Sequence, residues 1–275
     1  MANYTAADIK ALRESTGAGM MDVKKALDEA DGDTTKATEI LRVKGLKGVT
    51  KREGRSASNG LVRAQVEAGV GTLVEVNCET DFVAKGPKFG ELADQLLAQA
   101  VAVRATSAEE LLASDLDGRT VQVVVDEANA AIGEKIEVRR VARVEGPQVV
   151  SYLHKTNPDL PPQIGVLVAT EGGDEQTARD IAMHVAAFSP SVLSRDEIDA
   201  ETVASERRIA EETAREEGKP EQALPKIVEG RVNGFFKENV LLDQAFAKDN
   251  KKTVAQVAQE AGATVLGFAR FKVGV

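Results

Sequence analysis

The sequence contains few of the residue types from which catalytic and metal sites are usually built. Its 275 residues include one cysteine, two histidines and no tryptophan. The single cysteine, Cys78, excludes an intramolecular disulfide, which is typical of a protein from a reducing compartment. A GxxxxGK(S/T) phosphate-binding motif is also missing, so Lys135 is not the lysine of such a loop. These absences favour a protein that is not an enzyme and that carries no cofactor and no metal.

Long hydrophobic runs and an excess of positive charge are missing as well. No segment approaches the ~18–20 apolar residues of a membrane span, and the first five residues lack a basic, apolar signal pattern. There are 35 Lys and Arg against 44 Asp and Glu, a net charge of −9, whereas a surface that coats nucleic acid needs clustered positive charges. The sequence therefore predicts a cytoplasmic protein that binds neither membranes nor nucleic acid directly, and its length suggests two domains.

Residues 1–44 have the apolar periodicity of three short helices. Thr5 and Asp33 stand where helix N-caps are expected, and Asp31-Gly32 separates the second helix from the third. A unit of this size has a marginal core by itself and is typical of a recognition module. We expect a basic linker over residues 45–60 to join it to the rest of the chain.

A run of basic residues surrounds that boundary. Residues 42–55 contain one acid, Glu53, and six basic residues, Arg42, Lys44, Lys47, Lys51, Arg52 and Arg55. Clustered positive charge can bind phosphate, so an RNA- or ribosome-associated protein is the alternative function. The segment has no interleaved aromatic residues and the net charge of the chain is negative, so a solvated tether is favoured.

Beyond residue 60 one pattern occurs twice: a strand hairpin, a helical region and a β-rich run. The strand candidates are residues 61–66, 71–77, 149–153 and 164–170. Gly71 and Gly165 occupy equivalent places at the second strand of each copy. A weak duplication predicts two similar α/β subdomains, residues 61–146 and 147–275, with a chance likeness of two ordinary units as the alternative.

Residues 196–240 carry no strand signal. Their first half places opposite charges three and four residues apart, as on a solvated helix. Gly218-Lys219-Pro220 then marks a stop and a restart with the proline inside the first turn, and a second helical pattern follows. We expect an antiparallel helical hairpin that projects from the second subdomain.

Three side chains that could carry chemistry have simpler structural interpretations. Cys78 lies near a strand end with no basic residue close to it in sequence, which favours a buried structural thiol. His184 lies between apolar residues at helical spacing, which favours a hydrogen-bonded core histidine. His154 opens a proline-containing loop, where contact with a partner and a plain loop position are both compatible with the sequence.

The segment after the strand candidate 71–77 leaves two interpretations open. Thr80-Asp81 can cap the helix that follows, and Phe82 can then be a staple that packs against the core. An acid followed by an aromatic residue at a helix start can also present a wedge-like tip to another protein.

Several motifs, in order along nearly the whole chain, resemble the bacterial translation elongation factor Ts family. They are Thr16-Gly17-Ala18-Gly19-Met20-Met21-Asp22, Val74 to Ala84, Ile132-Gly133-Glu134-Lys135, Ile181 to Ala187, Gly218-Lys219-Pro220, Val228-Glu229-Gly230-Arg231 and Gly267 to Phe271. The resemblance implies a mixed α+β fold with an N-terminal three-helix domain of the ubiquitin-associated type. Two similar α/β subdomains with small antiparallel sheets and a projecting helical hairpin would follow.

The resemblance also implies a guanine nucleotide exchange factor for the GTPase elongation factor Tu, bound in its GDP and nucleotide-free forms during translation elongation. In the family's mechanism the segment Thr80-Asp81-Phe82-Val83 enters the GTPase, and the phenylalanine wedges between helices, disturbs the magnesium site and loosens GDP. Met20 and Met21, with Arg13 and Lys24 nearby, match the family's N-terminal contact surface, which adaptable methionines suit.

We add His154 to the expected docking residues because of its exposed loop position, and we expect the free protein to be a monomer. The sequence departs from the family pattern near its C-terminus. Some members continue beyond the equivalent of Val275 into a helix that embraces the GTPase, so that contact is expected to be missing. Residues 155–162 form a longer loop than in some relatives, and Ala245 stands where proline is common, so the contacts of the second subdomain stay open.

Overall fold

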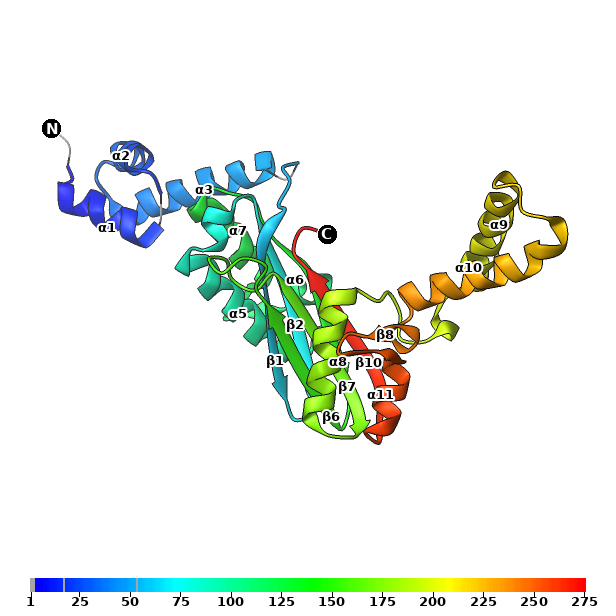
Figure 1. Ribbon diagram of the computed structural model, residues 1–275. Helices are drawn as coiled ribbons and strands as arrows, with labels where there is room; N and C mark the ends of the chain where they lie inside the picture. Colours follow the sequence, from blue (N-terminus) through cyan, green and yellow to red (C-terminus); the bar gives the residue numbers. More distant parts are fainter. Residues whose placement is uncertain (1–2, 17, 53) are drawn as a thin grey trace.

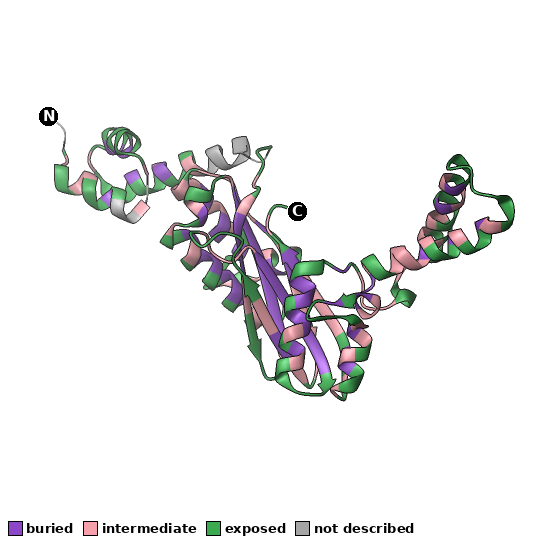
Figure 2. Cartoon of the chain, in the orientation of Figure 1, coloured by how far each residue is buried: buried purple, intermediate pink, exposed green. Residues whose placement is uncertain are grey.

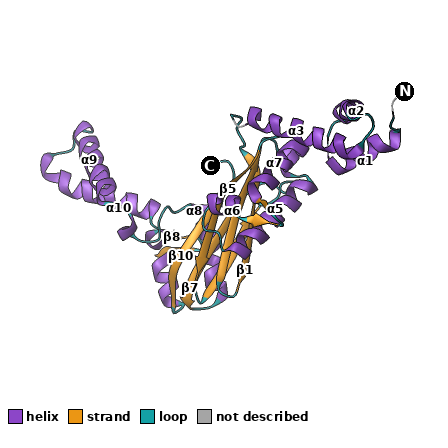
Figure 3. Cartoon of the chain, turned by 180° about the vertical axis from the view of Figure 1, so that it is seen from behind, coloured by secondary structure: helices purple, strands orange, loops and turns teal. Residues whose placement is uncertain are grey.

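The structure is a computed structural model that describes residues 3–16, 18–52 and 54–275. Met1, Ala2, Gly17 of the TGAGMM motif and Glu53 of the expected linker lie outside the described residues. Helices and small antiparallel sheets alternate along the chain, so the predicted mixed α+β class is confirmed (Figures 1 and 3).

The first helices are α1 (Ala6–Thr16), α2 (Met20–Glu29) and α3 (Thr34–Arg52). They enclose a small core that includes Leu12, Val23, Ala26, Leu27 and Ala37. Asp33 caps α3 as expected, since its Oδ1 accepts hydrogen bonds from the backbone N–H groups of Thr35 and Lys36 at 2.9 and 3.1 Å.

The third helix is longer than the sequence pattern predicts, because it ends at Arg52 and not near residue 44. Residues 45–52, expected in an irregular linker, continue this helix, which packs on α7 (Val121–Ile132). Gly45 permits this packing: a Cβ at that position would lie 2.6 Å from the Cβ of Ala130. Tertiary contact thus outweighs the low helix propensity of glycine. The basic composition of the segment, from which a linker is expected, does not report this contact.

Two three-stranded antiparallel sheets form the centre of the molecule. The first sheet contains β1 (Asn59–Glu67), β2 (Val70–Cys78) and β5 (Ile136–Glu145), in the order β1-β2-β5. The second contains β6 (Gln148–His154), β7 (Ile164–Gly172) and β10 (Ala263–Lys272), in the order β10-β7-β6. In both sheets, two consecutive strands form a hairpin that supplies one edge strand and the central strand. The other edge strand comes from later in the chain and pairs with the remaining side of the central strand.

The two sheets pack on each other through reciprocal contacts. A Cβ on Gly71 would lie 2.9 Å from side-chain atoms of Leu167 and Val149, whereas a Cβ on Gly165 would lie 2.6 Å from Leu73. Leu73 follows Gly71 by two residues, and Leu167 follows Gly165 by two. Each central strand therefore places one glycine and one leucine against the other central strand. The central strands are accordingly among the most buried parts of the chain (Figure 2).

Helices cover the outer faces of the sheets. The first sheet carries α4 (Asp81–Ala84), α5 (Pro87–Val103), α6 (Ala108–Ala113) and α7, and the second carries α8 (Glu175–Phe188) and α11 (Val254–Glu260). Two small ladders pair β3 (Asp115–Leu116) with β4 (Arg119–Thr120), and β8 (Ala245–Phe246) with β9 (Asp249–Thr253).

A pair of helices, α9 (Ala200–Glu216) and α10 (Leu224–Asn239), projects from the second sheet (Figure 1). Short 3₁₀ turns flank them at Arg195–Glu197, Glu221–Ala223 and Leu241–Asp243. Pro220 lies before the middle turn and not in the first turn of a helix as expected; Pro225 takes that place in α10. Within the described residues, no helix has the length and apolar character needed to cross a membrane.

Candidate functional site

The segment Thr80–Val83 begins two residues after the end of β2, the central strand of the first sheet, and continues into the short helix α4. Thr80 is the N-cap of α4, since its Oγ1 accepts a hydrogen bond from the Val83 N–H at 3.3 Å. Ala84 is buried, and Val83 packs against the core beneath the first sheet. One side of this helical turn therefore anchors the segment to the protein.

Phe82 lies on the other side of the turn, and 84% of its surface is exposed. This exposure rules out the interpretation of Phe82 as a staple that packs against the core. A large aromatic side chain in water forgoes the stabilisation that burial would provide, which is about 1.5–3 kcal/mol.

Asp81 is exposed beside Phe82 and forms an ion pair with Lys85, with 3.0 Å between Oδ2 and Nζ. The hydrogen bond from Lys85, followed by its positive charge, lowers the pKa of Asp81 below its ordinary value. The carboxylate is therefore ionised at neutral pH. The tip of the segment thus presents an apolar ring and a negative charge side by side.

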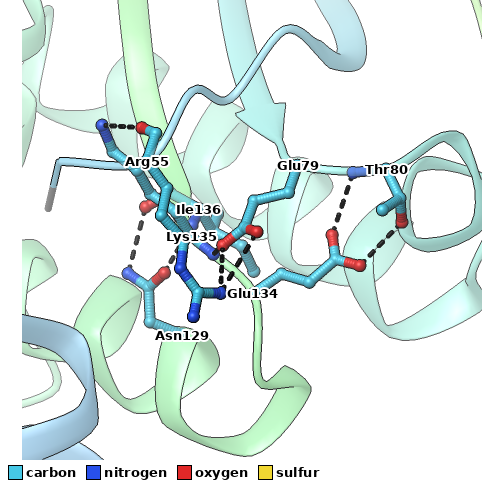
Figure 4. Close-up of polar contacts among 7 residues, drawn as sticks. All are labelled: Arg55, Glu79, Thr80, Asn129, Glu134, Lys135 and Ile136. Atoms are coloured by element: carbon cyan, nitrogen blue, oxygen red, sulfur yellow. Dashed lines mark hydrogen bonds and ion pairs between the residues drawn. The ribbon is translucent and has the colours of Figure 1, made fainter. Parts of the chain in front are cut away.

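The residues that hold this tip come from a turn far along the chain (Figure 4). The backbone N–H and the hydroxyl of Thr80 both donate to the carboxylate of Glu134, at 3.0 and 2.7 Å. The side chain of Glu79 accepts from the backbone N–H of Lys135 at 2.6 Å and from Arg55 at 3.2 Å. The sequence analysis missed these supporting residues, although the Ile132–Lys135 motif was a signal that this turn matters.

The turn between α7 and β5 is itself held in shape. Gly133 ends α7 with a φ of 85°, a left-handed conformation that glycine adopts without strain. The buried side chain of Asn129 donates to the Ile136 carbonyl at 3.0 Å and accepts from the Ile136 N–H (Figure 4). Glu134 and Lys135 therefore sit on a turn fixed at both of its ends.

The expected N-terminal docking residues lie on α1 and α2. Met20 and Met21 begin α2 with 57% and 64% of their surfaces exposed. Lys24 is also exposed and follows them by one helical turn, so the three share one side of the helix. Arg13 is exposed near the end of α1.

The two histidines have different surroundings. His154 is exposed at the last position of β6, where its Nδ1 lies 3.1 Å from the hydroxyl of Tyr152. His184 is fully buried in α8 and is hydrogen-bonded to Gln244 and to the Ala247 N–H, which confirms the prediction of a core histidine.

The described residues offer little chemistry. Cys78 is buried, and desolvation raises the pKa of its thiol to about 12, so the prediction of a structural thiol is confirmed. Within residues 3–16, 18–52 and 54–275, no group of three or more His, Cys, Asp or Glu side chains could hold a metal ion. What the arrangement provides is an exposed aromatic side chain on a helical turn that is held at its base.

Comparisons with known proteins point to one family. The family model described as Elongation factor TS matches residues 79–275. The elongation factor Ts of Micrococcus luteus is 67% identical over 277 aligned residues that cover 100% of both chains. Those of Renibacterium salmoninarum and Beutenbergia cavernae are 63% and 64% identical, again over 100% of each chain.

Proposed function

This chain belongs to the elongation factor Ts family, and from that membership we propose that it is a guanine nucleotide exchange factor for elongation factor Tu. It binds the GTPase in its GDP-bound and nucleotide-free forms in the cytoplasm and promotes GDP release during translation elongation. No covalent step is needed, because this protein and GDP can act as two ligands of one GTPase that weaken each other's binding. Such linked ligands weaken each other by equal factors. GDP therefore weakens the binding of this protein as much as this protein weakens GDP binding.

The exposed Phe82 is the observation that carries this proposal. Its ring is 84% exposed, while Thr80 before it is held by Glu134 and Val83 after it packs against the core. Burial of such a ring in a partner stabilises the complex by about 1.5–3 kcal/mol. A ring that enters between two packed helices can do so only if they move apart, since protein interiors are close-packed.

The mechanism follows from that displacement. Insertion of Thr80-Asp81-Phe82-Val83 moves groups that position magnesium in the GTPase, and GDP loses a cation that neutralises its phosphates. The ionised Asp81, which is paired with Lys85 in the free protein, enters at the same place. Magnesium belongs to the partner and is a competitor of this protein, so a rise in magnesium concentration opposes exchange.

The N-terminal helices serve as a second point of attachment. We interpret residues 1–44 as a docking domain of the ubiquitin-associated type, with Arg13, Met20, Met21 and Lys24 as its contact residues. Two adjacent exposed methionines suit a surface that adapts to its partner. His154 extends the contact to the second subdomain, residues 147–275.

The alternative function, binding of RNA by residues 42–55, is less well supported. Arg42 forms an ion pair with Glu127, Lys44 pairs with Glu29 at 2.6 Å, and Arg55 pairs with Glu79. Carboxylates that already neutralise these side chains compete with phosphate for them. The side chains of residues 46–53 lie outside the described part of the chain.

The proposal is tested by stopped-flow release of fluorescent GDP from elongation factor Tu, with and without this protein. We expect the release rate to rise with the concentration of this protein, to reach a plateau, and to fall when magnesium is raised. Binding to ribosomal RNA is measured in parallel at the same salt concentration. An unchanged GDP release rate together with salt-sensitive RNA binding would favour the alternative function.

A further inference from the structure

We propose that Glu134 is a positioning residue for exchange: its carboxylate holds Thr80 so that Phe82 is presented to the GTPase in one orientation. This inference rests on the proposed function and deepens it. Glu134 lies on the turn between α7 and β5 and belongs to neither the aromatic tip nor the N-terminal docking surface.

The carboxylate of Glu134 binds two donors of one residue. Its Oε2 accepts from the Thr80 N–H at 3.0 Å, and its Oε1 accepts from the Thr80 hydroxyl at 2.7 Å. Both bonds reach across 54 residues of sequence. Hydrogen bonds to an ionised acceptor are about twice as strong as those between neutral groups, and two of them define an orientation as well as a position.

Thr80 passes this orientation to the helical turn that carries Phe82. Its hydroxyl donates to Glu134 and at the same time accepts from the Val83 N–H at 3.3 Å. Successive hydrogen bonds of this kind polarise and strengthen one another. The carboxylate of Glu134 is therefore linked through one hydroxyl group to the backbone on the far side of Phe82.

A second clamp, formed by Glu79 and Lys135, lies directly beside the clamp formed by Glu134 and Thr80. Glu79 accepts from the backbone N–H of Lys135 at 2.6 Å, so two adjacent residues of one loop bind two adjacent residues of the other (Figure 4). Because Asn129 fixes the turn on which Glu134 and Lys135 lie, both clamps have a rigid base.

The exposed ring depends on such a base because α4 is short. It has four residues, and a helix of that length is not stable in water without tertiary support. A loop that must order itself on binding loses part of its binding free energy to that ordering. By holding the base of the loop, Glu134 reduces this cost and keeps Phe82 aimed outwards.

The test compares Glu134→Ala and Glu134→Gln with the wild type. Glu137→Ala is the matched control, because it removes the same charge from a residue close in sequence that pairs with Lys135 Nζ at 3.0 Å. Each variant is measured for its urea midpoint, for hydrogen exchange of the amides in residues 79–85, and for its effect on GDP release from elongation factor Tu.

In Glu134→Ala we expect the amides of Thr80 and Val83 to exchange faster and the maximal GDP release rate to fall roughly tenfold, which corresponds to about 1.4 kcal/mol. Glu134→Gln keeps one accepting oxygen, so its loss should be intermediate. Glu137→Ala should match the wild type in both measurements. The urea midpoint identifies any variant whose loss arises from unfolding, and rates are compared for folded protein only.

A double-mutant cycle with Phe82→Ala separates positioning from general stability. If Glu134 acts through Phe82, Glu134→Ala should change the residual rate of Phe82→Ala by less than about twofold, because coupled residues are not additive. An equal fold-loss in both backgrounds, or a Glu134→Ala variant with normal exchange, would overturn the positioning role. A wild-type protein that leaves GDP release unchanged would instead overturn the proposed function itself.

Discussion

Two phenylalanines close together in the sequence have opposite surroundings in this protein. Phe82 is 84% exposed, whereas Phe89 is 1% exposed in the core beneath the first sheet. Both lie in helical turns that follow β2, so the difference comes from the side of the turn on which each ring lies. The pair allows the contact role of one phenylalanine to be compared with the packing role of the other.

Phe82→Ala should leave the stability of the free protein nearly unchanged, within about 0.5 kcal/mol, and should greatly slow GDP release from elongation factor Tu. Phe89→Ala should lose about 3–5 kcal/mol, as truncation of a buried phenylalanine does. Urea denaturation and stopped-flow GDP release measure the two effects. A Phe82→Ala protein that is strongly destabilised but, while folded, exchanges GDP at the normal rate would contradict the wedge role.

His184 connects α8 to the base of the projecting helices. Its Nε2 lies 2.8 Å from Oε1 of Gln244, and its Nδ1 accepts from the Ala247 N–H at 3.1 Å. Since a neutral imidazole has one donor and one acceptor nitrogen, this arrangement fits the form protonated on Nε2. Burial lowers the pKa of His184 below its ordinary value of 6.5, against a smaller opposing effect of Gln244.

The lowered pKa of His184 predicts a loss of stability in mild acid. Below pH 6.5 the unfolded chain binds a proton at this histidine more readily than the folded chain does, so the free energy of unfolding falls as the pH is lowered through that value. Urea midpoints at pH 7.5 and about 5.5 measure the effect. His184→Gln should reduce the difference between them, and His154→Gln, which changes the exposed histidine, should preserve it. Equal pH dependence in both variants would exclude this role of His184.

At the scale of elements, the contact between α3 and α7 decides how the N-terminal helices are attached. Gly45 brings the two helices close at Ala130, and Glu127 on α7 accepts ion pairs from Arg42 and Arg119. Residues 45–52 are helical and do not form the irregular linker that their composition suggests. The attachment therefore has a defined packing geometry.

Gly45→Ala tests that geometry. Alanine normally favours a helix over glycine by about 1 kcal/mol, yet here its methyl group would lie 2.6 Å from the Cβ of Ala130. We expect the helices to separate, with faster hydrogen exchange in α3 and a lower thermal midpoint. Adding Ala130→Gly, which removes the opposing methyl group, should restore slow exchange in α3. If Gly45→Ala alone is more stable than the wild type, the helices do not pack this closely in solution.

At the scale of the whole molecule, the surfaces proposed to bind the GTPase lie on separate parts of the chain. Met20 and Met21 are on α2, whereas Phe82 is on α4 beside the first sheet. Two attachment points on one partner can have different roles. A docking contact raises the affinity of the complex without moving the nucleotide site, whereas the inserted segment changes that site. The two contributions are therefore separable by experiment.

Replacing both methionines, Met20→Ala with Met21→Ala, should raise the concentration of this protein that gives half-maximal GDP release, by roughly tenfold for a loss of about 1.4 kcal/mol. The plateau rate should stay unchanged, because Phe82 is intact. A titration of GDP release against the concentration of the variant measures both quantities. This variant is preferable to a deletion of residues 1–55, which would also remove Arg55 from Glu79. A lower plateau with an unchanged half-maximal concentration would argue against a docking role.

Much of the local structure could be predicted from the sequence. The four strand candidates correspond to β1, β2, β6 and β7, and Asp33 caps α3 as its position suggests. Such features depend on residues that are close together in the chain, through hydrogen bonds and the spacing of apolar side chains. The family motifs likewise identified Thr80–Val83 as the segment to test.

Only the tertiary structure decided how distant residues meet. The sequence left Phe82 open as a staple or an exposed tip, and the side of α4 that packs on the core settles that its ring is exposed. Nothing in the sequence pairs Thr80 with Glu134, because a contact across 54 residues depends on how β2, α7 and β5 pack. The reciprocal approach of Gly71 to Leu167 and of Gly165 to Leu73 is decided in the same way. The periodicity of apolar residues along the chain determines where a helix or strand forms and which of its faces is buried. Which other helix or strand packs against that face is decided by the close packing of the whole protein.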